Sequence, residues 1–271
     1  MKIGFVGGGN MAIAIIGGLL AKGQAAGDIA VAEREAHQRQ RLASDFGVKV
    51  EASPGDALAS ADVLVLAVKP QQMREAAASL VPLRGGQLIV SIAAGIRLAD
   101  LSRWLGGHQV LVRAMPNTPA LVHAGITGLH AASGVTEAQR DSASALLAAV
   151  GEVVWFDDEA MLDAVTAVSG SGPAYVFYFI EALEQAAKEL GLSPAQARLL
   201  AGQTFAGSVK LALAGEEPFS VLRERVTSRG GTTERALGVM QDARLKEHIV
   251  EAVKAACARS RELGDTLGKD A

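Results

Sequence analysis

The sequence predicts an α/β fold in two parts: a Rossmann-type doubly wound parallel sheet over residues 1–157, followed by an all-α C-terminal domain over residues 158–271. In the first part, short and continuously apolar segments alternate with helical segments, as in a parallel sheet that helices cover on both faces. A glycine-rich loop joins the first apolar segment to the first helix. After about Asp157, apolar residues recur at helical spacing and little strand pattern remains.

The first part is a succession of predicted strands and helices. Strands are expected at Lys2–Val6, Ile29–Ala32, Val63–Val68, Leu88–Ile92 and Val110–Ala114, with edge strands near Ile126–Ala131 and Val153–Phe156. A nearly all-apolar helix covers Met11–Lys22, and Gly23 is suited to end it. A charged helix runs from Glu33 to Phe46. This alternation favours right-handed crossovers between parallel strands.

The second part is predicted to be helical. Apolar residues recur at helical spacing from Val176 to Leu190, and Gly191 closes that helix. Further long helices are expected over Pro194–Ala214 and Ala243–Leu263.

Composition restricts the class of protein. The chain has 271 residues, 49% hydrophobic and 20% charged, which is ordinary for a globular protein with a sizeable core. A net charge of −3 without a basic run gives no electrostatic basis for binding nucleic acid. The single cysteine, Cys257, cannot form an internal disulfide, and we expect a cytoplasmic protein.

The N-terminal segment 3–21 is apolar enough to suggest a signal peptide or a membrane span. It contains six glycines, with Gly7–Gly9 in its middle, and each interior glycine costs a helix about 1 kcal/mol relative to alanine. We therefore expect a buried strand, a glycine turn and a buried helix, and no association with a membrane.

The segment Gly7–Ala12 fits the pattern G-x-G-x-x-A directly between the first strand and the first helix. Gly7 allows a tight turn, Gly9 lets the backbone approach a pyrophosphate, and Ala12 allows close packing of the helix on the sheet. The pattern predicts a dinucleotide site, and a glycine turn without a ligand is the alternative. The candidate cofactor residues of this loop are Gly7, Gly9, Asn10 and Met11.

Two adjacent residues leave the cofactor open. Glu33, at the end of the second strand, would bind both ribose hydroxyls of NAD and repel a 2′-phosphate. The guanidinium of Arg34, with Arg39 or Arg41 nearby, could instead pair with the phosphate of NADP. Both side chains are also explained as solvated surface charges. The sequence therefore predicts NADP or NAD without choosing between them.

Ligands of such sheets bind outside the carboxyl ends of the strands. Lys69 brings a positive charge to one of these ends, and small residues at the next leave room for a flat ring. Taken singly, each loop is explained as a polar strand end, but their convergence on one edge favours a cofactor. The candidate residues are Ala67, Val68, Lys69, Pro70, Ala93, Ala94 and Asn117.

The segment Val226–Leu237 places four hydroxyl side chains and two adjacent glycines at the start of a predicted helix. Backbone N–H groups at a helix N-terminus suit a small anion such as a carboxylate. Together with the glycine loop, this segment predicts an oxidoreductase that acts on a small acid. No cluster of Cys, His and Asp has the sequence spacing of metal ligands.

These motifs identify a resemblance: over nearly its whole length the chain is similar to pyrroline-5-carboxylate reductase. The shared motifs are GFVGGGNM at the start, AVKP at Ala67–Pro70, SIAAG at Ser91–Gly95, RAMPNTPALV at Arg113–Val122, SGSGPAYVF at Ser169–Phe177 and TSRGGTTERAL at Thr227–Leu237. Two residues depart from the family pattern. Arg229 replaces the usual Pro before the paired glycines, and Pro54 stands where many members have Asn near the adenosine phosphate.

The resemblance implies NAD(P)H-dependent reduction of the ring C=N of L-1-pyrroline-5-carboxylate to L-proline, the last step of proline biosynthesis. It implies that Thr233 is the catalytic residue, hydrogen-bonded to the ring nitrogen, and that Ser171 lines the substrate pocket. Glu216 stands where similar proteins have an acid near the proline site, and a solvated charge is an equally simple explanation. The implied carboxylate-binding residues are Ser228, Gly230, Gly231 and Thr232.

The family forms interleaved dimers through its helical domain, often assembled into larger rings. The resemblance therefore implies that residues 158–271 are a dimerisation domain, that the protein is a homodimer, and, by extension, that it forms a decamer. Two other functions stay open. The chain could be a reductase of a related cyclic imine, because Arg229 departs from the family pattern, or a noncatalytic NADP-binding regulatory protein. Retention of Thr233 and of the paired glycines argues against the second.

Overall fold

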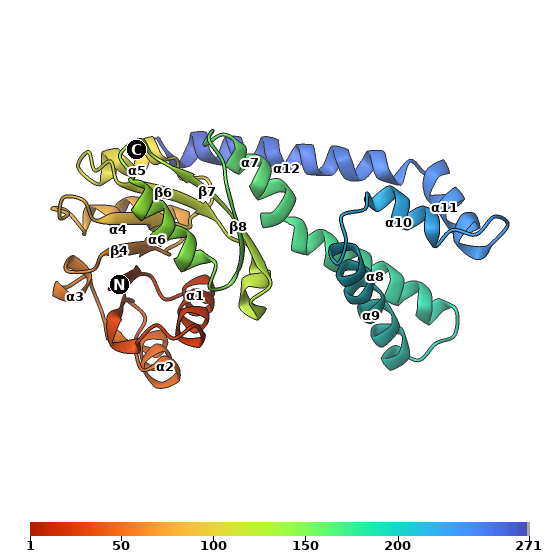
Figure 1. The fold of residues 1–271 in the computed structure, drawn as a ribbon, viewed down its shortest axis with the longest axis horizontal. Coiled ribbons are helices and arrows are strands. Elements are labelled where there is room, and N and C mark those ends of the chain that lie inside the picture. The colour runs from red at the N-terminus through yellow and green to blue at the C-terminus, as the bar shows by residue number, and fades with distance from the viewer. Residues whose placement is uncertain (270–271) are drawn as a thin grey trace. The chain divides into compact units, whose positions relative to one another are not determined.

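The computed structural model describes residues 1–269. Contacts group the chain into two compact units: Met1–Ser171 with the chain from Ala256 onward, and Gly172–Ala255. The first unit holds a sheet covered by helices, and the second is built of helices alone (Figure 1). The predicted fold class is confirmed, while the domain boundary after residue 157 stays a prediction.

One eight-stranded sheet organises the first unit, with the strand order β3-β2-β1-β4-β5-β6-β7-β8. Neighbouring strands are parallel except β6 and β7, which run antiparallel. Because β1 lies between β2 and β4, the direction in which the chain adds strands reverses beside β1. The strands are β1 (Ile3–Val6), β2 (Ile29–Ala32), β3 (Lys49–Glu51), β4 (Val63–Leu66), β5 (Leu88–Ser91), β6 (Leu111–Met115), β7 (Gly125–Ala131) and β8 (Gly151–Trp155).

The strand predictions agree with the structure to within two residues, including the edge strands β7 and β8. The strand expected to reach Val68 ends at Leu66, and the chain then enters a 3₁₀ turn at Pro70–Gln72. Pro70 restricts Lys69 to extended backbone, which fits this exit. The sequence did not predict β3, because it has only three residues and charges at both ends.

Helices cover both faces of the sheet. Three of them bury one face together with Phe5, Val31 and Val65: α1 (Asn10–Ala21), α2 (Ala36–Phe46) and α6 (Glu137–Leu147). Three shorter ones cover the other face around Leu64 and Ile89: α3 (Asp56–Ala59), α4 (Met73–Ala78) and α5 (Leu98–Trp104). Further 3₁₀ turns lie at Ala26–Asp28 and Thr118–Val122. Helices on both faces explain why the central strands are apolar throughout.

The end of the first unit contains an irregular helix. α7 (Met161–Val165) continues into a π-helical segment, Thr166–Gly170. The backbone N–H of Ser171 closes that segment by donating to the carbonyl of Thr166 at 2.8 Å. Short π-helical segments are frequent at functional sites, and this one coincides with the start of the SGSGPAYVF motif.

The second unit contains α8 (Gly172–Glu189), α9 (Pro194–Leu213), α10 (Phe219–Arg225), α11 (Thr232–Asp242) and the first part of α12 (Leu245–Leu267), as far as Ala255. The start of α9 follows from its sequence, because Ser193 and Gln196 form a capping box around Pro194. α10 was not predicted, since a seven-residue helix carries too little periodicity to detect.

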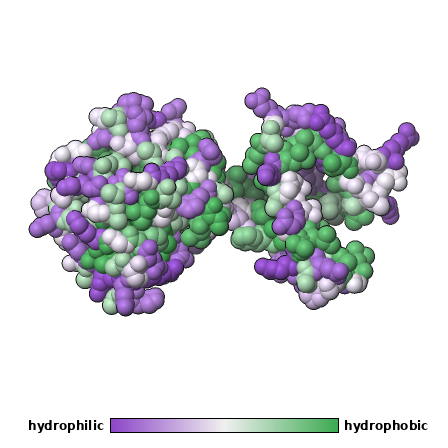
Figure 2. Space-filling view, turned by 60° about the horizontal axis from the view of Figure 1, so that its bottom comes forward, coloured by the Kyte–Doolittle hydropathy of each residue, from purple (hydrophilic) through white to green (hydrophobic). Residues whose placement is uncertain are grey.

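The helical unit exposes many large hydrophobic side chains. Figure 2 shows them in green over the right-hand lobe, and they include Phe177, Tyr178, Leu200, Leu213 and Phe219, each more than half exposed. A monomer rarely leaves so much apolar surface in contact with water. Within the described residues, no helix is at once long enough and apolar enough to span a membrane.

Close packing of α1 against the segment between α6 and β8 predicts opposite changes in stability when a methyl group is added at two adjacent glycines. A Cβ on Gly18 would collide with the carbonyl of Ala149 and come within 2.9 Å of Val150, whereas a Cβ on Gly17 meets only Phe46, at 3.5 Å. We expect Gly18→Ala to destabilise the chain by about 1–3 kcal/mol through overpacking. Gly17→Ala should stabilise it by up to about 1 kcal/mol through helix propensity.

The measurement is the urea denaturation midpoint of each variant. Gly17→Ala serves as the matched control, because it adds the same methyl group to the same helix. Equal midpoints for the two variants would contradict this account of how α1 packs.

Candidate active site

The glycine loop joins β1 to α1 with a backbone that only glycine adopts at its first position. Gly7 has φ +97°, and a Cβ there would lie 2.8 Å from the carbonyl oxygen of Ala67. At Gly9, by contrast, an added Cβ meets nothing within 4 Å. Gly7 is therefore required by the fold, whereas the space in front of Gly9 is open to a ligand.

The peptide groups on either side of Gly8 are held by the segment that follows β2. The Gly8 N–H donates to Glu33 Oε2 at 2.7 Å, and the Gly8 carbonyl accepts from Gln38 Nε2 at 2.7 Å. The other carboxylate oxygen of Glu33 accepts the N–H of Glu35 at 2.8 Å. Both oxygens of Glu33 thus accept hydrogen bonds from the protein backbone, and these bonds fix the orientation of the carboxylate.

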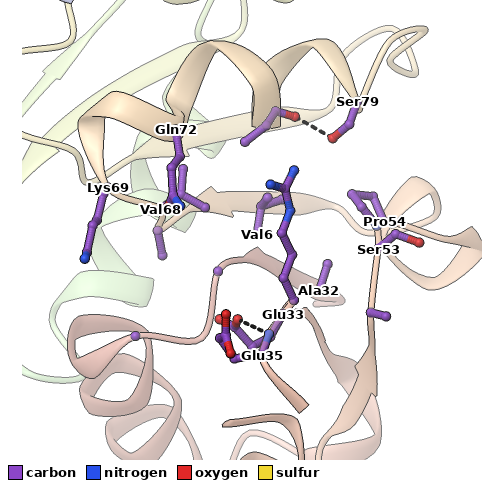
Figure 3. Close-up of a pocket in the computed structure, with 16 residues that line it drawn as sticks. Val6, Ala32, Glu33, Glu35, Ser53, Pro54, Val68, Lys69, Gln72 and Ser79 are labelled. Carbon is purple, nitrogen blue, oxygen red and sulfur yellow. Dashed lines mark hydrogen bonds between the residues drawn. The ribbon is translucent and has the colours of Figure 1, made fainter. Parts of the chain in front are cut away.

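A cavity of about 410 Å³ opens at the carboxyl ends of β1 to β4, in front of the glycine loop. Figure 3 shows Val68, Lys69 and Gln72 on one side of it, Ser53 and Pro54 on the other, and Glu33 and Glu35 below. Seven predicted cofactor residues line this cavity: Gly7, Gly9, Glu33, Arg34, Ala67, Val68 and Lys69. The structure therefore brings together residues from three separate stretches of the sequence.

Arg34 connects the end of β2 to α4. Its Nη2 lies 2.7 Å from Glu75 Oε1, and both side chains are mostly exposed, at 63% and 67%. The hydrogen bond and the charge of Arg34 lower the pKa of the Glu75 carboxyl, and Glu75 in turn raises the pKa of Arg34. Arg39 supports the same segment, donating to the backbone carbonyls of Glu33 and Arg34 at 2.8 and 2.6 Å.

The remaining predicted cofactor residues lie outside this cavity. Asn10 and Met11 begin α1, Pro70 begins the turn after β4, and Ala93 and Ala94 follow β5. Asn117, after β6, is buried, and its side chain joins two segments of the same unit. Its Nδ2 donates to the Ser169 carbonyl at 3.2 Å, and its Oδ1 accepts the Ile126 N–H at 2.9 Å.

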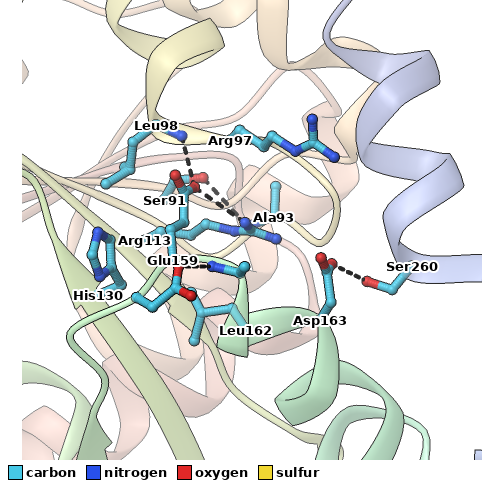
Figure 4. Close-up of polar contacts among 12 residues, drawn as sticks. Ser91, Ala93, Arg97, Leu98, Arg113, His130, Glu159, Leu162, Asp163 and Ser260 are labelled. Atoms are coloured by element: carbon cyan, nitrogen blue, oxygen red, sulfur yellow. Dashed lines mark hydrogen bonds and ion pairs between the residues drawn. The ribbon is translucent and has the colours of Figure 1, made fainter. Parts of the chain in front are cut away.

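An ion pair between a buried arginine and a partly exposed glutamate links β6 to the segment before α7. Arg113 on β6 has only 4% of its side chain exposed and lies 3.1 Å from Glu159, which also accepts the N–H of Leu98 at 2.8 Å (Figure 4). Next to it, the Ser260 hydroxyl donates to Asp163 at 2.6 Å, and both residues are buried. These contacts bind α7 and the last part of α12 to the sheet.

In the helical unit, the predicted substrate residues form one loop before α11. Gly230 adopts φ +71° and Gly231 is the N-cap residue, with no side chain capping the helix. The Gly230 N–H donates to Glu234 Oε2 at 2.7 Å. The N–H groups of Thr232 and Thr233 occupy the first turn, where a helix offers no acceptor of its own. Ser228 precedes them and Arg229 is exposed.

Two predicted substrate residues lie elsewhere. Glu216 is exposed in the loop between α9 and α10, beside Glu217, which is ion-paired with Arg225. Ser171 ends the first of the two stretches that make up the first unit, and it closes the π-helical segment. The roles of all predicted site residues stay predictions.

Sequence reasoning missed one residue that lines the cavity, Ser53, and two that bond residues of the surrounding segments, Gln38 and Glu75. Gln38, which bonds the Gly8 carbonyl, lies 30 residues away from it in the sequence, and Glu75 lies 41 residues from Arg34. Polar residues on exposed helix faces carry no local signal of such contacts. Ser53 follows β3, so its position depended on a strand that the sequence did not reveal.

Comparison with known proteins gives two family models and several close relatives. The model "Pyrroline-5-carboxylate reductase dimerisation" matches residues 159–263, and "NADP oxidoreductase coenzyme F420-dependent" matches residues 2–95. A pyrroline-5-carboxylate reductase of Pseudomonas aeruginosa is 48% identical over 99% of this chain and 98% of its own length. One from Pasteurella multocida is 41% identical over 97% of each.

Solved structures agree. A pyrroline-5-carboxylate reductase from Coxiella burnetii superimposes with a TM-score of 0.91 at 40% identity, covering 97% of this chain and 98% of the other. A Plasmodium falciparum pyrroline carboxylate reductase with NADP bound gives a TM-score of 0.87 at 28% identity, with the same coverage.

The doubly wound sheet, its glycine loop and the cavity in front of that loop are those of a dinucleotide-binding protein, and the relatives place it among the oxidoreductases. With 48% identity over nearly the whole chain, the protein belongs to the pyrroline-5-carboxylate reductase family. The resemblance drawn from the sequence motifs is confirmed.

Proposed function

We propose that this protein catalyses the reduction of L-1-pyrroline-5-carboxylate to L-proline with NADPH or NADH. The observation that carries the proposal is the 48% identity to a pyrroline-5-carboxylate reductase over 99% of the chain. The geometry supports it independently, since a cavity suited to a dinucleotide lies in front of a loop that follows the G-x-G-x-x-A pattern.

The cavity residues fit the adenosine half of the cofactor. Gly9 leaves room for a pyrophosphate at the start of α1, where backbone N–H groups and the helix dipole favour negative charge. Lys69 adds a positive side chain on the same edge. When bound, reduced NADP or NAD supplies the hydride; Ala93 and Ala94 after β5 would leave space for its flat nicotinamide ring.

The loop before α11 would bind the substrate carboxylate. Because Glu234 already accepts the Gly230 N–H, the open N–H groups of Thr232 and Thr233 are the ones available to an incoming anion. Ser228 and Gly231 would complete this binding site. A carboxylate held there fixes one end of the ring, which favours the alignment at about 3–3.5 Å that hydride transfer requires.

Thr233 would orient the ring nitrogen through its hydroxyl. A threonine hydroxyl is too weak an acid to supply the net proton, so the imine binds already protonated or takes its proton through water. Ser171 and Glu216 would belong to the substrate pocket.

The protein would act as a homodimer in the cytoplasm. The match of residues 159–263 to a dimerisation model and the exposed hydrophobic side chains of the helical unit support the dimer. Assembly of dimers into a decamer is a further proposal. We propose no nucleic-acid partner, in keeping with the net charge of −3.

Replacing the Thr233 hydroxyl tests the proposed chemistry. We expect Thr233→Val to lower kcat/KM for pyrroline-5-carboxylate by about tenfold or more, a loss of at least about 1.4 kcal/mol of transition-state stabilisation. The assay follows NADPH and NADH oxidation with the five-membered imine and with its six-membered homologue. Thr266→Val is the control, because that hydroxyl already donates to the Glu262 carbonyl on α12.

Absence of turnover of the five-membered imine by the unmodified protein with either cofactor would refute the proposed function. Unchanged kcat/KM in Thr233→Val would refute the role of the hydroxyl only.

The variant Gly9→Ala tests cofactor binding without a large effect on folding. Because a Cβ at Gly9 meets nothing within 4 Å, Gly9→Ala should cost the ligand-free protein no more than about 1 kcal/mol, through the weaker N-cap of α1, as its melting curve would show. The same methyl group should obstruct the pyrophosphate and weaken NADP⁺ binding by roughly tenfold or more. Calorimetric titration with NADP⁺ measures this, and unchanged affinity would place the pyrophosphate elsewhere.

A further inference from the structure

NADP differs from NAD by a phosphate in place of the 2′-hydroxyl on the adenosine ribose. The preference between the two cofactors therefore depends on the charged residues at the cavity that face this position. In a doubly wound sheet the residue at the end of β2 faces this ribose. Here two residues of opposite charge, Glu33 and Arg34, occupy that position.

Glu33 has a structural task that accounts for its position. Its two carboxylate oxygens accept the N–H groups of Gly8 and Glu35 at 2.7 and 2.8 Å. A carboxylate that selects NAD binds both ribose hydroxyls with its two oxygens. The oxygens of Glu33 are instead directed at the loop and at the start of α2, which leaves Arg34 as the residue that discriminates.

Arg34 forms an ion pair with Glu75 of the same chain. Arg34 lines the cavity, and its Nη2 lies 2.7 Å from Glu75 on α4. Ala76 of that helix and its C-cap residue Ser79 line the cavity too. The ion pair therefore links two segments that line the same cavity. A ribose 2′-phosphate would need the same guanidinium donors that Glu75 now occupies, because Arg binds carboxylate and phosphate with the same planar group.

We propose that Glu75 is a specificity-determining positioning residue: through its ion pair with Arg34 it competes with the 2′-phosphate and sets how strongly the protein prefers NADPH over NADH. Arg34 makes the attractive contact with the phosphate, and Glu75 weakens that contact by holding the guanidinium. Glu33 maintains the glycine loop for either cofactor. The inference rests on the proposed function, since it assigns this cavity to the adenosine half of the cofactor.

Two adenosine fragments test the inference without any turnover. Adenosine 2′,5′-bisphosphate carries the 2′-phosphate and 5′-AMP lacks it, so the ratio of their dissociation constants isolates discrimination at this position. Calorimetric titration of the full chain gives both constants. We expect the unmodified protein to bind the 2′-phosphorylated fragment more tightly, and Arg34→Gln to remove most of that preference.

Glu75→Gln should strengthen binding of the bisphosphate by about two- to fivefold, the range expected for releasing an exposed ion pair, and leave 5′-AMP unchanged. In the Arg34→Gln background, the same change should have little effect, because Glu75 acts through Arg34. Arg41→Gln is the matched control: it removes a guanidinium on α2 that pairs with Asp45 and does not line the cavity.

The outcomes distinguish a failure of the adenosine-site assignment from a failure of the role proposed for Glu75. If the unmodified chain binds neither fragment, the cavity is not the adenosine site, and this part of the proposed function fails together with the inference. If it binds both, but Glu75→Gln leaves their ratio unchanged, the inference alone is overturned. A full gain from Glu75→Gln in the Arg34→Gln background would also overturn it, because Glu75 would then act by its own charge.

Discussion

The cofactor edge of the sheet depends on two hydrogen bonds that fix the backbone of Gly8. Glu33 and Gln38 bind the N–H and the carbonyl of this one residue, so the segment after β2 fixes the turn between β1 and α1. A carboxylate that accepts a backbone N–H forms one of the stronger hydrogen bonds available to a protein. The side chains fit closely, since a Cβ on Gly8 would lie 2.5 Å from Leu42.

Two consequences follow for the cofactor edge. Gly7 is confined against Ala67, so the glycine loop and the end of β4 cannot separate without breaking backbone packing. The start of α1 is then presented to the cavity with its N–H groups free of any side-chain cap. At the other half of the sheet, Glu159 links the buried Arg113 of β6 to the N–H of Leu98, and its removal would leave the Arg113 charge uncompensated.

The local sequence pattern was sufficient to predict the elements that form the candidate site. β1, the glycine loop and α1 are contiguous in sequence, and both their periodicity and their glycines identify them without tertiary information. The loop before α11 was likewise evident from its glycines and hydroxyls. What the sequence could not supply were contacts between distant segments. The side chain of Asn117, for example, bonds Ile126 and Ser169, the latter 52 residues away, and no sequence pattern indicated either contact.

The central proposal is that each unit carries one binding region: the glycine-loop cavity of the first unit binds the dinucleotide, and the loop before α11 in the second unit binds the small acid. Amide hydrogen exchange of the full chain tests this directly, with saturating NADP⁺ alone and then with L-proline added. The account predicts that NADP⁺ slows exchange at residues 7–12, and that proline additionally slows it at residues 228–234. Proline that binds without slowing exchange at residues 228–234 would contradict the account.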